Sequence, residues 1–431
     1  MSAKKFTVAL AALLTLTACG SGSAGSGEGG LKGATLDVVG TWTGDEQAAF
    51  EAVLAEFSSQ TGATVRYTAA GDELPTVLQT RTQGGTPPNV ALVPQPGLVE
   101  QFTKQGVLKP LNDEVKQTVA DNYAPIWSKL GSVGGTMYGI TFKVANKSTV
   151  WYDSDAFETA GVSVPKTWDE FIAVSKTVSE TGTAAVSIGG ADGWTLTDWF
   201  ENVYLRTAGP EMYDKLAFHE IPWTDPSVRK ALEVLAVLFA DQKLIDGGAS
   251  TALQTDFAKS VTNVFSDPPK AAMVFEGDFV AGVIRANTKA DVGGKAKFFP
   301  FPSVGGSPEG AVVGGDIAVQ FRDDEATNAL MKFLAQPKAG EVWAAKGGYL
   351  SPNKNIAVKT YVDSVSQELA TQLVEAGDNV RFDLSDLTPS AFGGTKGAGM
   401  WKDLQDFLAD PSKLDAVVQS LEANAAKAYG K

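Results

Sequence analysis

The chain has 431 residues, of which 44% are hydrophobic and 20% charged, a composition typical of soluble globular proteins. The length exceeds what one simple core usually serves, so two lobes are expected. The formal net charge of −14, with no stripe of lysine and arginine to offset it, argues against nucleic acid as a partner.

The N-terminal segment has the pattern of an export signal. Two lysines precede the apolar run Phe6–Thr17, which is shorter than the roughly 20 residues needed to span a bilayer. Small residues then lead to Cys19, the single cysteine, and this arrangement resembles a bacterial lipoprotein signal whose cysteine becomes lipidated. We expect residues 1–18 to be removed and residues 19–33 to form a flexible tether, which anchors the protein to the cell membrane outside the cytoplasm. An ordinary secretory signal with an incidental cysteine is the alternative.

The segment after the tether alternates between strand and helix patterns. Three predicted strands, Thr35–Trp42, Ala63–Ala69 and Asn89–Val93, are separated by two segments with apolar residues at helical spacing. Crossovers of this length imply parallel strand pairing and therefore an α/β lobe. Gln95 follows the third strand directly, at the edge of an open α/β sheet where ligands bind.

The stretch Gly134–Phe171 is predicted to carry the chain from this lobe into a second one. Extended runs around Ile140–Phe142 and Thr149–Tyr152 are joined by the polar link Asn146–Ser148, which favours a hinge. A capping-box pair then begins a helix over Thr167–Ser179.

The second lobe is expected to contain strands at Ala185–Ile188 and Ala271–Phe275. Further along, Lys297–Phe301 and a strand over Gly310–Val319 are expected to return the chain to the first lobe. Within that strand, Gly314-Gly315-Asp316 is predicted to form an abrupt polar turn. The predicted division gives the N-terminal lobe residues 34–145 plus 297–350, and the C-terminal lobe residues 146–296 plus 351–431.

The residue types that most catalytic sites require are scarce. His219 and Cys19 are the sole histidine and cysteine, so Ser-His-Asp or Cys-His catalysis and zinc or iron sites are not supported. The glycine-rich run Gly393–Gly399 is predicted to be a loop and not a phosphate cradle, because it lacks the phosphate-binding spacing. We therefore expect no metal and no cofactor. Paired carboxylates of a glycoside hydrolase stay open, because 50 acidic residues always offer pairs.

Aromatic and planar polar side chains fall at loop positions beyond strands, a combination that suits sugars. A sugar ring offers C–H faces to tryptophan or tyrosine, and its hydroxyls bind carboxylates, amides and lysines. Trp168 is interpreted as a helix start, and Trp343 and Trp401 as core residues. The candidate ligand-binding residues are Trp42, Asp72, Gln95, Lys143, Trp194, Glu276, Asp278 and Asp316.

Several motifs, taken in order, resemble the extracellular sugar-binding proteins of ABC importers, the family that includes the maltose-binding protein. Those motifs are Tyr138-Gly139-Ile140, Trp151-Tyr152-Asp153, Pro165–Phe171, Glu276-Gly277-Asp278-Phe279, Gly314-Gly315-Asp316 and Gly347–Pro352. Within that family, three segments look most like the α-glucoside binders: Pro94–Gly97, Trp194–Phe200 and Arg381–Asp386.

This resemblance implies an α/β, two-lobed periplasmic-binding-protein fold with a ligand cleft between lobes joined by a multi-crossover hinge. Closure would bring the candidate residues of both lobes onto an α-glucoside or related di/oligosaccharide, and the closed monomer would deliver it to the permease subunits of the importer without covalent chemistry. A secreted glycoside hydrolase and a surface sugar receptor for a sensor system are the alternatives.

Overall fold

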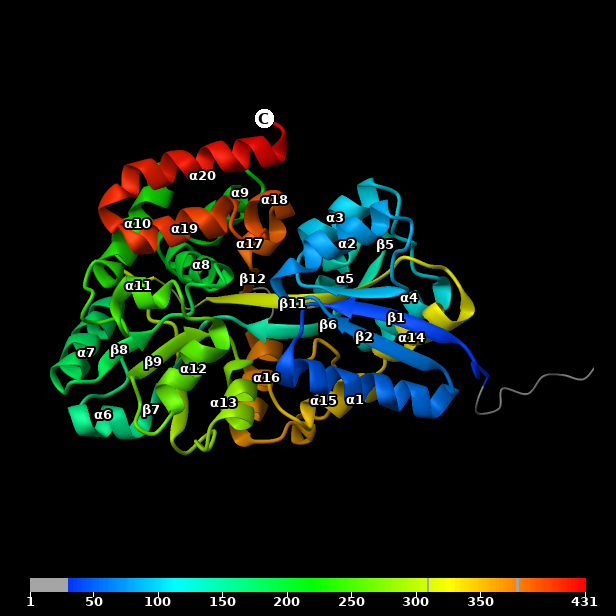
Figure 1. The fold of residues 1–431 in the computed structure, drawn as a ribbon, viewed down its shortest axis with the longest axis horizontal. Helices are drawn as coiled ribbons and strands as arrows, with labels where there is room; N and C mark the ends of the chain where they lie inside the picture. The colour runs from blue at the N-terminus through cyan, green and yellow to red at the C-terminus, as the bar shows by residue number, and fades with distance from the viewer. Residues whose placement is uncertain (1–29, 308–309, 377–379) are drawn as a thin grey trace, which may run out of the picture.

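The computed structural model describes residues 30–307, 310–376 and 380–431, so the predicted signal segment, Cys19 and most of the tether lie outside the described residues. Within the described ranges, no helix combines the length and the apolar character that a membrane span requires. Two α/β units lie side by side along the long axis of the molecule, and β11 runs through the region between them (Figure 1).

The first unit is built on a six-stranded sheet in the order β12-β11-β3-β1-β2, with β6 also paired to β11. As the crossover lengths predict, β1 pairs in parallel with both β2 and β3, whereas β11 is antiparallel to β3 and β6. The strands are β1 Thr35–Gly40, β2 Thr64–Ala69, β3 Val90–Val93, β6 Gly139–Asn146, β11 Ala311–Gln320 and β12 Val380–Phe382.

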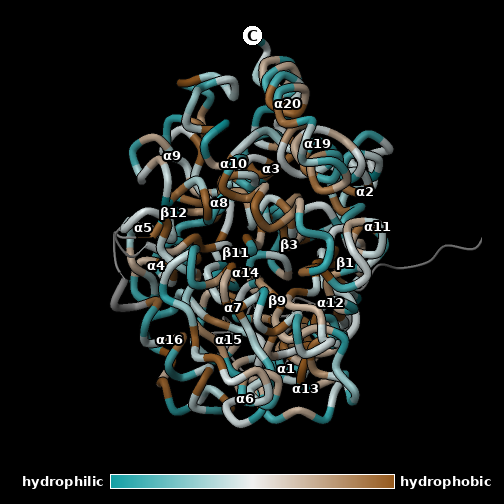
Figure 2. The backbone as a smooth tube through the Cα atoms, turned by 90° about the vertical axis from the view of Figure 1, so that its left-hand side faces the viewer, coloured by the Kyte–Doolittle hydropathy of each residue, from teal (hydrophilic) through white to brown (hydrophobic). Residues whose placement is uncertain are grey.

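Both faces of this sheet are covered by helices, so its central strands are apolar on both sides. In β3, Val90 and Leu92 pack into one core cluster while Ala91 and Val93 pack into another, as the two-residue period of a strand requires. Hydrophobic stretches accordingly lie on the inner strands in Figure 2. The principal helices of this unit are α1 Gly44–Thr61, α2 Leu74–Gln83, α3 Pro96–Lys104, α4 Asp113–Asn122, α5 Pro125–Leu130, α14 Glu325–Leu334 and α15 Pro337–Ala344, and a small hairpin joins β4 Ser132–Val133 to β5 Thr136–Met137.

The second unit has a four-stranded sheet in the order β10-β7-β9-β8, formed by β7 Thr149–Asp153, β8 Ala184–Ser187, β9 Ala271–Glu276 and β10 Ala296–Pro300. A large apolar core joins this sheet to the surrounding helices. The helices from β7 onward, apart from α14 and α15, are α6 Ser154–Ala160, α7 Trp168–Glu180, α8 Trp194–Ala208, α9 Pro210–Ala217, α10 Pro226–Phe239, α11 Gly248–Ala252, α12 Phe257–Phe265, α13 Val280–Asn287, α16 Ser364–Ala376, α17 Leu384–Leu387, α18 Ser390–Gly393, α19 Gly399–Ala409 and α20 Leu414–Tyr429.

The predicted passage from one unit to the other is confirmed, because β6 belongs to the first sheet and β7 to the second. Two further connections run beside it. Lys147 donates its backbone N–H to the carbonyl of Val312 at the start of β11, and Asp383, after β12, donates its own to Val313, both at 2.8 Å. We call this place, formed by Lys147, Ser148, Val312, Val313 and Asp383, the crossing point.

Two expectations about the returning segment are wrong. Lys297–Pro300 does not return to the first unit: it lies in β10 and pairs antiparallel with Thr149–Tyr152 of β7. Gly314-Gly315-Asp316 is not a turn, because these residues lie inside β11 and pair with Lys143–Ala145 of β6; the irregularity is a register shift between Asp316 and Ile317. In both cases the structure is set by pairing with a strand far away in sequence, β7 for residues 297–300 and β6 for residues 314–316.

The capping box at the start of α7 is confirmed. Glu170 donates its backbone N–H to the Thr167 hydroxyl, and the Glu170 carboxylate accepts the Thr167 backbone N–H, each at 3.2 Å. Thr167→Ala is expected to lower the free energy of unfolding by about 1 kcal/mol, since one orphan N–H of the helix loses its acceptor. Urea denaturation measures this loss. Thr177→Ala, an exposed change within the same helix, is the control and should stay within about 0.5 kcal/mol of the parent protein.

Candidate functional site

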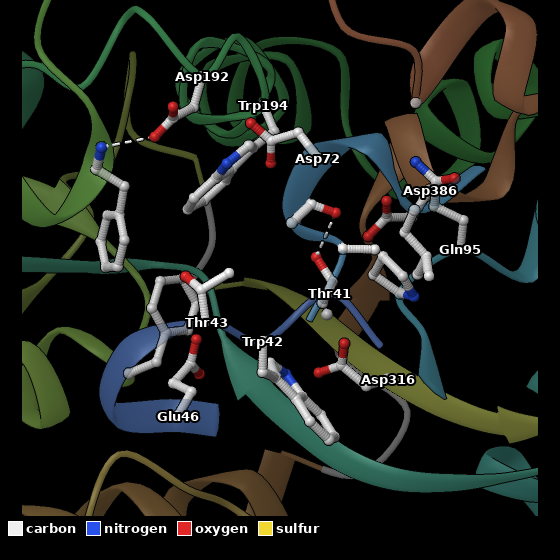
Figure 3. A pocket seen from close by; sticks show the side chains of 18 of the residues that line it. Thr41, Trp42, Thr43, Glu46, Asp72, Gln95, Asp192, Trp194, Asp316 and Asp386 are labelled. Atoms are coloured by element: carbon white, nitrogen blue, oxygen red, sulfur yellow. Dashed lines mark hydrogen bonds between the residues drawn. The ribbon is translucent and has the colours of Figure 1, made fainter. Parts of the chain in front are cut away.

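A cleft of about 620 Å³ lies between the two units, within the usual range of small-molecule sites. Its walls come from both units and from the strands that connect them (Figure 3). The lining residues are Thr41–Thr43, Glu46, Ala70–Pro75, Pro94 and Gln95 from the first unit, Lys143, Ala145, Lys147 and Gly314–Asp316 near the crossing point, and Asp192, Trp194, Asp256–Ala258, Phe279, Ser385, Asp386, Gly394, Lys396 and Trp401 from the remaining segments.

The carboxyl ends of three parallel strands supply one wall of the cleft. Trp42 follows β1, Asp72 lies in a short 3₁₀ turn after β2, and Gln95 follows β3 as the residue before α3. This is the edge at which an open α/β sheet binds ligands, so strand order alone brings these side chains together. The Gln95 amide oxygen is buried and has no hydrogen-bond partner within the described chain, which leaves it free to accept from a ligand.

Six of the eight predicted ligand-binding residues line the cleft: Trp42, Asp72, Gln95, Lys143, Trp194 and Asp316. The structure does not bring the other two, Glu276 and Asp278, to its wall. Glu276 is 1% exposed at the end of β9, where burial and the nearby charge of Asp198 raise the pKa of its carboxyl group well above its usual range. Asp278 accepts the backbone N–H of Asn146 at 2.7 Å, so it ties the loop after β9 to the chain beside the crossing point. Both carboxyl groups are buried outside the lining of the cleft, and their role in ligand binding stays a prediction.

Tryptophan rings stand on both sides of the open space. Trp42 is held edge-on by Phe50 and Trp343, whose ring centroids lie 4.8 and 4.7 Å away. Trp194 opens α8 and packs against Phe257 at 5.3 Å. Figure 3 shows Trp42 and Trp194 on opposite sides of the cavity, and both side chains line the cleft.

Trp401 is a lining residue that the sequence-based prediction placed in the core. Its side chain is largely buried, as predicted, yet part of it reaches the cleft, and its indole N–H has no partner within the described chain. Trp401 comes soon after the loop that carries Lys396. The position of Trp401 just after a glycine-rich loop could have indicated a cleft residue. The helical spacing of Trp401, Leu404 and Leu408 favoured a core position instead.

The cleft carries more acidic than basic groups. Its lysines are each committed to carboxylates: Lys143 lies 2.6 Å from Glu46, Lys147 lies 2.5 Å from Asp383, and Lys396 lies 3.7 Å from Asp72. Seven lining residues are acidic and three are lysines. The acidic ones are Glu46, Asp72, Glu73, Asp192, Asp256, Asp316 and Asp386.

Five of these acids form no ion pair within the described chain, and Asp192, Asp316 and Asp386 are among them. Burial is the main cause that raises the pKa of Asp192 and of Asp316 to about 6. Burial, followed by the charge of Asp383, raises the pKa of Asp386 well above its usual range. Asp192 and Asp316 are therefore mostly ionised above about pH 6 and can accept hydrogen bonds from donors that enter the cleft, although one Asp192 oxygen already accepts the backbone N–H of Phe257 at 2.6 Å. Asp386, whose raised pKa favours its protonated form, can instead donate to a ligand oxygen.

A buried acidic cluster lies beneath the cleft around Asp198, Glu201 and Asp383, which are close enough together to suggest a metal site. All but one of the carboxylate oxygens that the structure describes as buried there have partners; the exception is the second oxygen of Asp198. Glu201 accepts two backbone N–H groups, from Leu384 and Ser385, at 2.8 and 2.9 Å, and Lys147 forms ion pairs with both aspartates. Burial disfavours the charge on Lys147, but the surrounding carboxylates outweigh burial and raise its pKa. The Lys147 ammonium therefore occupies the position that a metal ion would take between these carboxylates.

Two α/β units joined by several connections, with a cleft lined from both sides, define a two-lobed solute-binding protein. Residues 41–341 match the family model described as bacterial extracellular solute-binding protein. The chain therefore belongs to this family, and the predicted fold is confirmed.

Relatives agree with this assignment over nearly the full length. The osmoprotective compounds-binding protein GgtB of Synechocystis sp. is 35% identical over 92% of this chain and 94% of its own. The alpha-glucosides-binding periplasmic protein AglE of Rhizobium meliloti is 37% identical over 89% of this chain and 86% of its own. The solved structure of the bacterial solute receptor AcbH matches with a TM-score of 0.80 at 19% identity, over 92% of this chain and 99% of that one, and supports the fold. The relatives are binding proteins, so this chain is a binding protein and not an enzyme.

Proposed function

We propose that this protein captures an uncharged α-glucoside or related di/oligosaccharide and delivers it to the permease of an ABC importer. The two units act as lobes that close on the sugar, with residues 297–300 assigned to the C-terminal lobe. Cys19 carries the lipid that holds the monomeric protein at the outer side of the cell membrane. Ligand contacts to both walls exist only when the lobes are closed, so sugar binding shifts the population toward the closed form.

The observation that carries this proposal is the pairing of Trp42 and Trp194 across a cleft rich in unpaired acceptors (Figure 3). Tryptophan faces bind the apolar C–H surface of a sugar ring, and Asp192, Asp316 and Gln95 can accept its hydroxyl hydrogens. The similarity to AglE favours α-glucosides, whereas GgtB adds small osmoprotective compounds to the ligands worth testing.

A thermal-shift panel tests the substrate class. Maltose, trehalose, sucrose, longer α-glucans and glycosylated osmoprotectants are added separately to the purified protein, and a tight ligand must raise its melting temperature by linkage. Failure of every carbohydrate to do so would contradict the proposal. Sugar uptake is then measured in cells that lack the matching permease. Loss of uptake would favour transport, whereas unchanged uptake would favour the sensor alternative.

The affinity for the sugar is expected to depend on pH. Asp192 and Asp316, with pKa values of about 6, are anionic above that pH, and carboxylates accept hydroxyl hydrogens more strongly than carboxylic acids do. Affinity should therefore fall about tenfold from pH 7 to pH 5 for each of them that must be ionised. Titration calorimetry measures this fall, and Asp316→Asn should make it shallower. Constant affinity from pH 7 to pH 5 would exclude both carboxylates as sugar acceptors.

The same two carboxyl groups should affect stability with the opposite sign. Their pKa values are higher in the folded protein than in the unfolded chain, so the folded state holds these protons more tightly. Their favourable contribution to the free energy of unfolding is fully present below about pH 4 and is lost as the pH rises through about 6. This separates the effect of pH on binding from its effect on folding.

Anionic sugars are expected to bind poorly. The cleft's lysines are paired with Glu46, Asp72, Asp198 and Asp383, so none of them is free to neutralise a phosphate or carboxylate on the ligand. A uronic-acid analogue should bind at least about tenfold more weakly than the neutral parent sugar, a difference of about 1.4 kcal/mol. Calorimetry at low and high salt measures it. Equal affinity for both sugars would show that the acidic excess does not select ligands.

A further inference from the structure

Lys147 lies where the connections between the two units run side by side. Its backbone N–H bonds to Val312 at the start of β11, and Val312 in turn donates to the Ser148 hydroxyl at 2.9 Å. Asp383, which follows β12, donates its backbone N–H to Val313. Residue 147 therefore belongs to one connection and adjoins the other two.

The side chain of Lys147 reaches the same connections. Its ammonium nitrogen lies 2.5 Å from a carboxylate oxygen of Asp383 and 3.2 Å from one of Asp198. Its aliphatic stem lies on Gly314 of β11, where an added Cβ would come within 2.9 Å of the Lys147 Cε. A larger residue at position 314 would push this end of the lysine side chain aside.

Lys147 also holds the helix that carries the Trp194 ring. The ammonium nitrogen lies 5.5 Å from the centroid of the Trp194 ring, a cation–π distance. Asp198 binds that ammonium, and Asn202 donates to the Lys147 carbonyl at 2.9 Å. Trp194, Asp198 and Asn202 are spaced by four residues and therefore share one face of α8. All three residues of this face therefore contact Lys147, through a cation–π contact, an ion pair and a hydrogen bond.

We propose that Lys147 is a positioning residue that couples the Trp194 ring to the crossing point, so that bending there during closure sets where the ring meets the ligand. This inference rests on the proposed function of the cleft. It assigns to Lys147 a task beyond neutralising Asp198 and Asp383, which are both fully buried.

Charge neutralisation has to be separated from positioning, because Lys147→Met alone leaves a buried carboxylate unpaired and destabilises the fold for that reason. The double variant Lys147→Met/Asp383→Asn removes the ammonium and the charge of the nearer carboxylate that it meets. The other carboxylate, Asp198, has its pKa raised to about 7 chiefly by burial, so it can take up a proton when the ammonium is absent. Asparagine keeps an acceptor for the cap of α17, where the Asp383 side chain now accepts the Asp386 backbone N–H at 3.0 Å.

The chain offers a closely matched control. Lys295 lies 3.3 Å from Asp153, a buried aspartate that caps α6, and neither residue lines the cleft. The pair Lys295→Met/Asp153→Asn therefore makes the same chemical change away from the Trp194 ring.

The first readout needs no ligand. Protein labelled with 5-fluorotryptophan is observed by ¹⁹F NMR, with the Trp194 resonance assigned through Trp194→Phe. We expect this resonance to broaden or split in Lys147→Met/Asp383→Asn and to stay single and sharp in the control pair. A single sharp Trp194 resonance in both double variants would overturn the proposal, whether or not a sugar is known.

The second readout is sugar affinity, measured with maltose, trehalose and sucrose in parallel. Lys147→Met/Asp383→Asn should bind the sugar recognised by the parent protein at least tenfold more weakly, while the control pair binds as the parent does. Parent-like affinity in Lys147→Met/Asp383→Asn would show that Lys147 only compensates charge, and would overturn the coupling. Absence of sugar binding by the parent protein would count against the proposed function instead, and the ¹⁹F result would still decide the placement of Trp194.

Discussion

Replacing Trp194 with alanine is expected to weaken binding of the cognate sugar by about 30-fold, which corresponds to about 2 kcal/mol. The ring stands at the start of α8 with one side toward the cleft, so its loss removes a contact surface on one wall. The fold should lose little, because the ring is only half-buried and the helix below it is fixed by Asp198 and Asn202. Calorimetry gives the affinity and thermal unfolding gives the stability.

Trp194→Phe is the matched control for this prediction. It keeps an aromatic face of smaller area and should recover part of the affinity. Unchanged affinity in Trp194→Ala would remove Trp194 from the binding site, and with it the two-sided arrangement that supports the sugar proposal.

Replacing Trp343 with alanine is expected to lower the free energy of unfolding by about 3–5 kcal/mol, since it leaves a large cavity in the core of the first unit. The side chain is 1% exposed and stacks on Tyr349 at 5.2 Å. It also supports Trp42 edge-on. The variant should therefore lose sugar affinity as well as stability, whereas Trp194→Ala loses affinity alone.

Urea denaturation of Trp343→Ala measures the loss of stability. Phe218→Ala removes a side chain that is 55% exposed and serves as the control, with an expected change within about 0.5 kcal/mol. A loss below about 1 kcal/mol in Trp343→Ala would mean that the core around Trp42 can collapse onto the vacated space.

Features that depend on neighbours in sequence were predictable. The capping box at Thr167 involves residues within a few positions of each other, and it is present. The placement of Trp42 and Gln95 in the cleft followed from parallel strand order, because the ends of such strands share one edge.

Features set by distant partners were not predictable. Lys147 was missed because its partners Asp198 and Asp383 are 51 and 236 residues away in sequence. Glu276 was assigned to the site because it ends a strand, yet its carboxyl group is buried beside Asp198. The position of a residue at the end of a strand indicates where its Cα atom lies. The packing of the surrounding elements then decides whether its side chain reaches the cleft.

The crossing point has a mechanical consequence. A single connection between two bodies would let them twist, slide and bend, whereas three connections that are hydrogen-bonded to one another act together as a flat strap. Twisting or sliding would break the hydrogen bonds of Lys147 to Val312 and of Asp383 to Val313, but bending across the strap keeps them. If the lobes close as proposed, we expect the softest motion to be rotation about one axis, which would bring the same residues of the two walls opposite each other at every closure.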